Sequence, residues 1–199
     1  DSLNMDYIAL GHIHKRHEAL GGKGIIYNPG SPEPLGFDEP GEHGIFLGTI
    51  KKDDNGKSSV SAIFLKVNEK DYQNIVVDIS GSCSDEQTGN IILKSLGDKD
   101  LSRTLLKITL RGYVEPGYKA DTGFLESRFS GKAFFIKIND ETVPDYDFDS
   151  LSAEPGLKGL FVRKMMKLIA AAESPKKKEI YTRALYYGIE ALEHGEIKV

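Results

Sequence analysis

The sequence has 199 residues and a mass of 22.0 kDa, which suits one ordinary domain or two small ones. Hydrophobic residues make up 39% of the chain and charged residues 28%, so it can build a core, and a disordered tail or a collagen-like repeat is excluded. The net charge of -4 and the sequence pI of about 5.8 argue against a broadly basic surface that coats nucleic acid, although a local basic groove stays open.

The sequence shows neither a membrane span nor a secretion signal. The longest apolar runs, residues 45–47 and 75–77, are far shorter than the roughly 20 residues that a membrane helix needs. Residues 1–6 lack a cationic patch followed by an apolar stretch, so we expect no signal peptide. Cys83 is the only cysteine and cannot form an internal disulfide, which predicts a cytoplasmic location.

The first third of the sequence predicts strands and loops without a helix. Residues 7–10 are apolar and end at Gly11, as a buried strand that runs into a loop would. Residues 24–27 are also strand-like. Residues 45–50 and 60–67 predict a hairpin, because an Asn-Gly turn signal lies between them.

The middle of the sequence alternates strand and helix patterns, which predicts a small α/β module. Apolar residues recur at every second position in its strands and a capping residue opens its first helix. The predicted elements are a strand at 75–79, a helix from Ser84 to Leu96 closed by Gly97, a strand at 106–110, a helix at 122–129 and a strand at 134–138.

The last part of the sequence predicts two amphipathic helices. Apolar residues fall at helical spacing over 157–172 and again over 178–194, and Ser174-Pro175 separates the two. Residues 140–149 are acidic and contain proline, so we interpret them as a linker. The expected domains are residues 1–68, residues 69–150 and residues 151–199.

The strongest local signal for chemistry is Gly11-His12-Ile13-His14, directly after the first strand. On an extended segment, residues two apart point the same way, so His12 and His14 would present two imidazoles to one side. Such a pair can serve two metal ions about 3.5–4 Å apart, as in binuclear hydrolytic sites. The alternative is a pair of solvent-exposed loop residues, and the tetrapeptide alone does not choose between them.

The surrounding sequence resembles a known family. Residues 6–16 and 27–33 resemble the last signature of calcineurin-like metallophosphoesterases, and within them the SbcD-type double-strand-break repair nucleases. Residues 35–44 resemble a bacterial branch of YhaO-like exonucleases. The similarity is strong over residues 6–50, and looser but order-preserving over the α/β module and the helices.

This resemblance implies an α/β (α+β) fold: the end of a metallophosphoesterase β-sandwich, a small α/β capping domain and C-terminal helices. It implies that His12 and His14 are ligands of two divalent metal ions, usually manganese, at a site that hydrolyses phosphodiesters with a metal-activated water. The capping domain would guide DNA. The C-terminal helices would dock the coiled coil of an SbcC-type ATPase partner.

The chain departs from the family because the carboxylate-bearing motifs expected upstream of Gly-His-x-His do not occur in it. Two imidazoles without a bridging carboxylate hold a binuclear pair poorly, since hard cations prefer oxygen ligands. The chain also lacks an initiator Met. We therefore expect a C-terminal portion of a nuclease that does not retain the metals and is inactive by itself.

Other polar residues near the signature have weaker claims to a role. Lys15, Arg16 and His17 are candidates for holding a DNA phosphate, with a solvated loop as the alternative. His43 and Asn28 are candidates for supporting the metal ligands from behind. His43 could equally be a turn residue, and the loop that begins at Asn28 is expected to support the site.

Two other functions stay open at this point. One is a non-catalytic module that holds DNA and the ATPase subunit, and the other is a phosphoesterase that acts on a different phosphate ester. The apolar arc of helix 157–172 is wider than one packing face needs, so we expect exposed apolar surface that a partner or a second copy of the chain covers. The main stripe is Leu157, Phe161, Met165, Leu168 and Ile169, and the expected surplus is Val162 and Met166.

Overall fold

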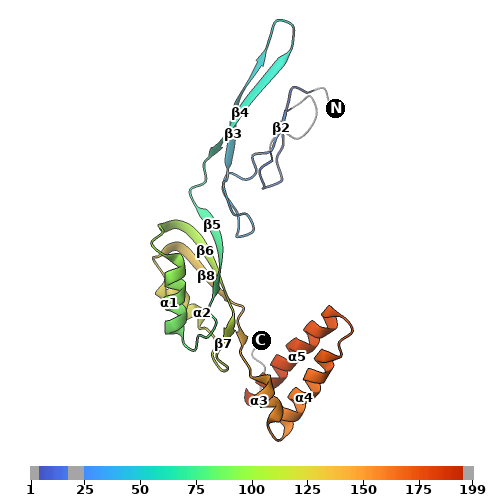
Figure 1. The fold of residues 1–199 in the computed structure, drawn as a ribbon. Helices are drawn as coiled ribbons and strands as arrows, with labels where there is room; N and C mark the ends of the chain where they lie inside the picture. The colour runs from blue at the N-terminus through green and yellow to red at the C-terminus, as the bar shows by residue number, and fades with distance from the viewer. Residues whose placement is uncertain (1–4, 18–24, 195–199) are drawn as a thin grey trace. The chain divides into compact units, whose positions relative to one another are not determined.

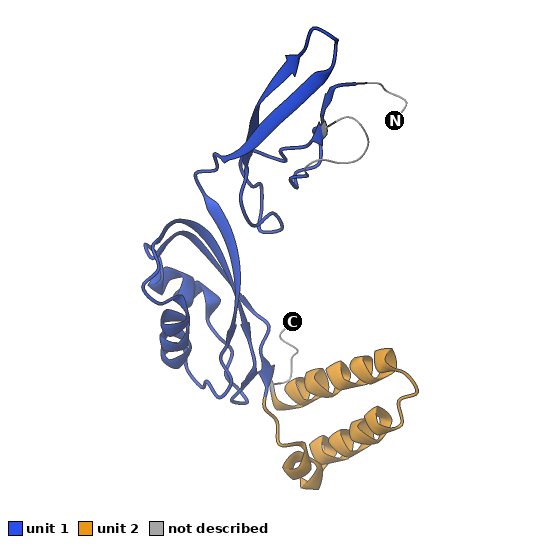
Figure 2. Cartoon of the chain, turned by 45° about the horizontal axis from the view of Figure 1, so that its top comes forward, with its two compact units in different colours: residues 1–144 blue, residues 145–199 orange. Residues whose placement is uncertain are grey.

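The structure is a computed structural model that describes residues 5–17 and 25–194 (Figure 1). The chain divides into two compact units, residues 1–144 and residues 145–199 (Figure 2). Helices and strands are both abundant, which confirms the general α/β class. The finer division at residues 68 and 150 stays a prediction.

The first part of unit 1 contains two pairs of strands. Strand β1 (Tyr7–Ala9) pairs in parallel with β2 (Ile25–Tyr27). Strand β3 (Gly44–Lys52) pairs antiparallel with β4 (Ser58–Lys66) in an unbroken register. The predicted hairpin is therefore present, with both strands longer at the turn than the sequence pattern indicated.

An aromatic cluster lies on one face of this hairpin. Phe46 and Phe64 are cross-strand partners whose ring centroids lie 5.4 Å apart, and the Tyr27 ring lies 4.6 Å from that of Phe46. Such pairs add to the free energy gained by burying apolar area. The contact between Tyr27 and Phe46 joins β2 to the hairpin. The opposite hairpin face carries four exposed apolar side chains, those of Ile45, Leu47, Ile63 and Leu65.

The second part of unit 1 is the predicted α/β module. Strands β5 (Asp71–Asp78), β6 (Leu101–Arg111) and β8 (Ala133–Asp140) form a parallel sheet in that order. Helices α1 (Asp85–Leu96) and α2 (Thr122–Arg128) connect them on one face (Figure 1). Right-handed crossovers between parallel strands that advance in one direction place both helices on the same side.

The core of this module lies between the sheet and its two helices. Val77, Ile108 and Ile138 from the three strands are buried with Ile92 of α1 and Leu125 of α2. Their alternation along the strands is the period-of-two pattern seen in the sequence. Burial on this face accounts for the alternating apolar residues of β5 and β6, whereas in β8 it covers Ile136 and Ile138 and leaves Phe134 exposed.

The ends of α1 follow from its sequence. Ser84 is the N-cap and its hydroxyl accepts a hydrogen bond from the backbone N–H of Gln87, while Gly97 caps the C-terminus. The Gln87 side chain in turn accepts from the backbone N–H of Cys83. A polar cap of this kind satisfies backbone donors that the first helical turn leaves unpaired.

Two features of unit 1 and its boundary were not anticipated. Strands β7 (Tyr113–Val114) and β9 (Val143–Pro144) form a short parallel pair, and helix α3 covers Phe148–Ala153. The boundary between the two units falls inside residues 140–149, after Pro144, as expected for a linker before the helices, but the segment also contains β9 and the start of α3. Its acidic residues have local roles as well, since Asp147 caps α3 by accepting from the N–H groups of residues 149 and 150.

Unit 2 is helical. Helices α4 (Leu157–Ala170) and α5 (Pro175–His194) pack on each other and on α3, around the buried side chains of Val162, Leu185 and Ile189. Pro175 both separates the two helices and opens the second, a position that needs no backbone N–H. None of the helices in the described residues has the length and apolar character needed to cross a membrane.

The apolar surplus on α4 is real but consists of other residues than expected. Val162 is fully buried, and Met166 packs against the core cluster. Leu157, Leu160 and Leu168 are exposed instead, at 67%, 44% and 46% of their accessible areas. The packing of α3 and α5 decides which part of the arc faces inward, and helical spacing alone cannot show that.

Candidate functional site

The residues after β1 do not form the extended segment that the sequence argument assumed. The backbone N–H of Ile13 donates to the carbonyl of Gly11 at 2.9 Å, and His12 has a φ of +72°. This is a γ-turn with a non-glycine residue in the left-handed region. The two-residue alternation therefore does not apply, and the argument that His12 and His14 face one side for that reason is wrong.

The backbone strain at His12 is itself informative. Among the described residues His12 is the only non-glycine with a positive φ. Such a conformation costs on the order of 1–3 kcal/mol and persists where the surroundings enforce it. Strained residues cluster at binding and catalytic sites.

Asn28 enforces the conformation of the histidine loop. Its side chain is buried, and its amide nitrogen donates to the carbonyl oxygens of Ile13 at 2.8 Å and Lys15 at 3.2 Å. Its backbone exchanges two hydrogen bonds with that of His17. Asn28 thus holds the main chain of residues 13–17 in place, and its expected role behind metal ligands stays a prediction.

The next loop approaches the same segment closely. The carbonyl of His14 accepts a hydrogen bond from the backbone N–H of Ser31 at 3.0 Å. Gly30 has a φ of +78°, and a Cβ atom at this position would lie 2.2 Å from the His14 carbonyl oxygen. Only glycine fits there, which explains why this loop carries glycine at position 30.

The closest polar contact of the site joins His14 to Glu39. Nδ1 of His14 lies 2.5 Å from Oε1 of Glu39, and the other carboxylate oxygen accepts from the N–H of Leu35 at 3.1 Å and the hydroxyl of Ser31 at 3.3 Å. The hydrogen bond from His14, with the contact to Leu35, holds the pKa of Glu39 below its ordinary value. Glu39 was not among the predicted site residues. It lies 25 residues after His14, and no local sequence pattern indicates a contact over that separation.

His43 contacts the backbone of the loop that carries Ser31 and Glu39. Its side chain is buried, with Nδ1 2.9 Å from the carbonyl oxygen of Ser31 and Nε2 3.0 Å from that of Glu39. Its backbone N–H donates to the side chain of Asn68 at the end of the hairpin. His43 therefore fixes the backbone of the loop that carries Glu39, rather than acting as a simple turn residue.

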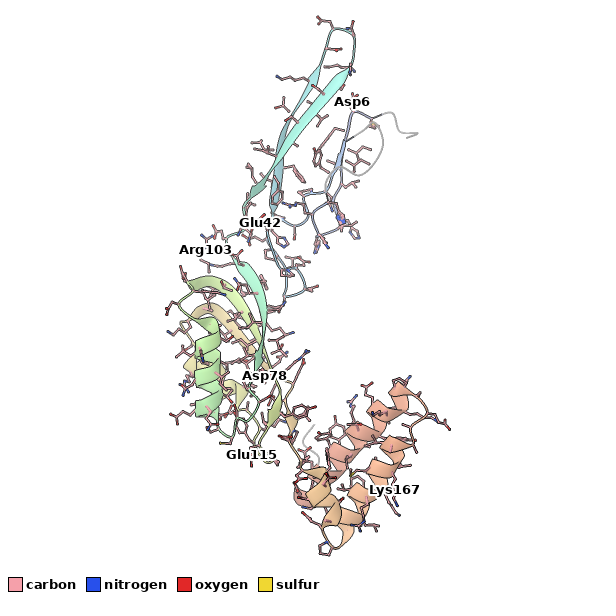
Figure 3. The ribbon with its side chains drawn as sticks, in the orientation of Figure 1. Asp6, Glu42, Asp78, Arg103, Glu115 and Lys167 are labelled. Carbon is pink, nitrogen blue, oxygen red and sulfur yellow. The ribbon has the colours of Figure 1, made fainter. Side chains whose placement is uncertain are left out.

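A cavity of about 550 Å³ opens beside His14. Its lining includes Lys15 and Arg16 together with three carboxylates, those of Asp38, Glu39 and Glu42. Glu42, labelled in Figure 3, lies on the loop that leads into β3. The cavity wall thus offers both cations for an anion and oxygen atoms for a metal.

The three cationic candidates differ in their surroundings. The guanidinium carbon of Arg16 lies 4.1 Å from the centroid of the Phe64 ring, a cation–π contact that orients the side chain. Lys15 is exposed at the cavity. His17 is engaged by Asn28 and by the carbonyl of Arg16, which accepts from Nδ1 at 3.0 Å. Lys15 and Arg16 therefore line the same cavity as His14, whereas His17 forms hydrogen bonds that hold the loop together.

A complete metal centre is not formed by the described residues. No group of three or more His, Cys, Asp or Glu side chains within residues 5–17 and 25–194 is arranged to hold a metal ion. The partial set is His14, held by Glu39, with His12 two residues before it in the strained turn. A pair of divalent ions held here would take further ligands from outside this partial set.

Comparison with known proteins leaves the family open. No family model matches the sequence, and no curated protein matches it. The resemblance to metallophosphoesterases therefore stays a prediction that depends on the residues around Gly11-His12-Ile13-His14.

Proposed function

We propose that this chain is the C-terminal portion of an SbcD-type, metal-dependent DNA nuclease, with His12 and His14 as ligands in a site for two divalent ions. The observation that supports this most is the hydrogen bond from His14 to Glu39 beside a cavity lined by Lys15 and Arg16. A metal-bound imidazole commonly donates its second N–H to a carboxylate. The expected metal is Mn²⁺, with the remaining ligands on a preceding segment.

Within such a site the residues of this chain would have separate tasks. A divalent ion, when bound, supplies a Lewis acid and an activated water for phosphodiester hydrolysis. Lys15 and Arg16 would hold a DNA phosphate at the cavity, since Arg16 is already oriented by Phe64. Asn28 and His43 would keep the two loops in place from behind.

The α/β module and the helices would serve the same nuclease as a cap that guides DNA and as a docking unit. Leu157, Leu160 and Leu168 lie along one side of α4 at helical spacing and are exposed. An amphipathic coiled coil of an ATPase subunit would cover such a stripe. The second candidate function, a non-catalytic module that holds DNA and the ATPase, draws on the same three leucines.

Hydrolysis assays separate these two functions. The 199-residue chain and the protein encoded by its complete reading frame are each tested with Mn²⁺ on linear duplex DNA and on bis-p-nitrophenyl phosphate. We expect turnover only by the longer protein, and we expect His12→Ala and His14→Ala each to abolish it without unfolding the chain. Turnover that persists in either variant with unchanged metal content would refute the nuclease proposal.

Absence of hydrolysis by the longer protein, with retained binding to the coiled coil, would favour the docking module. Hydrolysis of the small ester without cleavage of DNA would favour a phosphoesterase with another substrate. A matched control is His17→Ala, which removes an imidazole from the same loop at a position that serves the loop framework.

A further inference from the structure

The carboxylate of Glu39 is held in place by hydrogen bonds other than the one with His14. One oxygen accepts hydrogen bonds from the N–H of Leu35 and the hydroxyl of Ser31, so the other oxygen, 2.5 Å from Nδ1 of His14, has little freedom to move. The Glu39 side chain retains 17% of its accessible area, whereas that of His14 retains 47%. The anchored partner of the pair is therefore the glutamate.

The contact determines which ring nitrogen of His14 carries the proton. An ionised carboxylate only accepts hydrogen bonds, so Nδ1 must be the donor. A neutral imidazole protonated on Nδ1 has its lone pair on Nε2. Among the described residues Nε2 of His14 has no hydrogen-bond partner, and the ring stands at the cavity lined by Lys15 and Glu42.

We infer that Glu39 is a positioning residue, which holds the His14 ring with its proton on Nδ1 and so presents Nε2 as the atom that binds a divalent cation. The inference rests on the proposed function and adds to it the ligand atom and the residue that sets it. The main chain of His14 is held by the same loop, through the N–H of Ser31. Both the backbone and the ring of the ligand are thus oriented from residues 31–39.

The test measures the ring nitrogens of His14 directly. The ¹⁵N-labelled 199-residue chain is studied by NMR at neutral pH, without metal and then during titration with Zn²⁺, an ion that imidazole binds well. Glu39→Ala removes the acceptor, and Glu39→Gln keeps a side-chain oxygen at the same reach. Glu33→Gln is the matched control, because Glu33 lies on the same loop, its carboxylate accepts from the backbone N–H of Glu69, and it is not among the residues that line the cavity.

In the wild type we expect the Nδ1–H form of His14, with Zn²⁺ shifting the Nε2 resonance. In Glu39→Ala the proton should move toward Nε2, the site it prefers in free histidine, and the Zn²⁺ dissociation constant should rise at least tenfold, the usual lower bound for loss of such a partner. Glu39→Gln should keep most of the Nδ1–H form, and Glu33→Gln should match the wild type. The backbone amide resonances of Asn28 and Ser31 check that the loops remain folded.

Two results would overturn the inference. They are an unchanged tautomer and Zn²⁺ affinity in Glu39→Ala, and a Zn²⁺ shift at Nδ1 in the wild type. Neither of these depends on hydrolysis. A longer protein that fails to cleave phosphodiesters would refute the proposed nuclease and leave the tautomer and Zn²⁺ results standing.

Discussion

Gly188 on α5 provides a direct test of how the helical unit packs. A Cβ atom at this position would lie 2.1 Å and 2.4 Å from two ring carbons of Phe161 on α4, far inside van der Waals contact. Gly188→Ala therefore displaces the Phe161 ring, which packs against the core of unit 2. Overpacking of this kind costs about 1–3 kcal/mol.

The same substitution improves intrinsic helix propensity by up to about 1 kcal/mol, so the two effects oppose each other. With about 2 kcal/mol for the displaced ring, the net loss of stability is about 1 kcal/mol. For a unit of this size that lowers the melting temperature by roughly 4–8 °C. Gly123→Ala in α2 is the control, because its Cβ atom would meet nothing closer than 3.4 Å.

Hydrogen exchange of backbone amides is the assay, since it reports on α4 and α5 separately from unit 1. We expect faster exchange in both helices of Gly188→Ala, unchanged exchange in β5, β6 and β8, and no loss of protection in α2 of Gly123→Ala. Phe161→Leu shortens the clashing side chain and should recover part of the loss when combined with Gly188→Ala. Protection of α4 and α5 equal to or above the wild type in Gly188→Ala would refute the close helix contact.

Three further predictions concern the strained turn, a half-buried tyrosine and the exposed leucines. His12→Gly should be more stable than His12→Ala by about 1 kcal/mol in chemical denaturation, because only glycine adopts a φ of +72° without strain; equal stabilities would contradict the γ-turn. Burial, followed by the hydrogen bond to Asp85, raises the pKa of Tyr118 to about 12, so its stabilising contribution is complete below pH 10 and is lost as the pH rises toward 12. The part of the phenolate absorbance that the wild type shows and Tyr118→Phe lacks should therefore appear with a midpoint near pH 12. A midpoint near pH 10 would contradict the raised pKa of Tyr118. Leu160→Asp should weaken coiled-coil binding or self-association in sedimentation without unfolding α4, and unchanged sedimentation would refute the docking assignment.

Local pattern accounts for most of the secondary structure. Helix α1 begins after Ser84 and ends before Gly97 as expected, because caps act over three or four residues of sequence. The strand alternation in β6 likewise identifies its buried face, since a period of two is a property of the backbone itself. Such features require no knowledge of what packs against them.

Several of the errors involve partners that are distant in sequence. The inward face of α4 depends on α3 and α5, so Val162 is buried and Leu157 is exposed, contrary to the expected stripe. The short pairing of β7 with β9 links segments about 30 residues apart. No local periodicity encodes such contacts.

The candidate site shows the same division. Residue types and spacing made His12 and His14 candidates, with Lys15 and Arg16 beside them, and the family resemblance implied the metal role, which stays a prediction. Only the tertiary structure placed Glu39 against His14 and the left-handed turn at His12. A ring orientation depends on hydrogen bonds between loops, and these form only when Asn28, Ser31 and His43 bring the loops together.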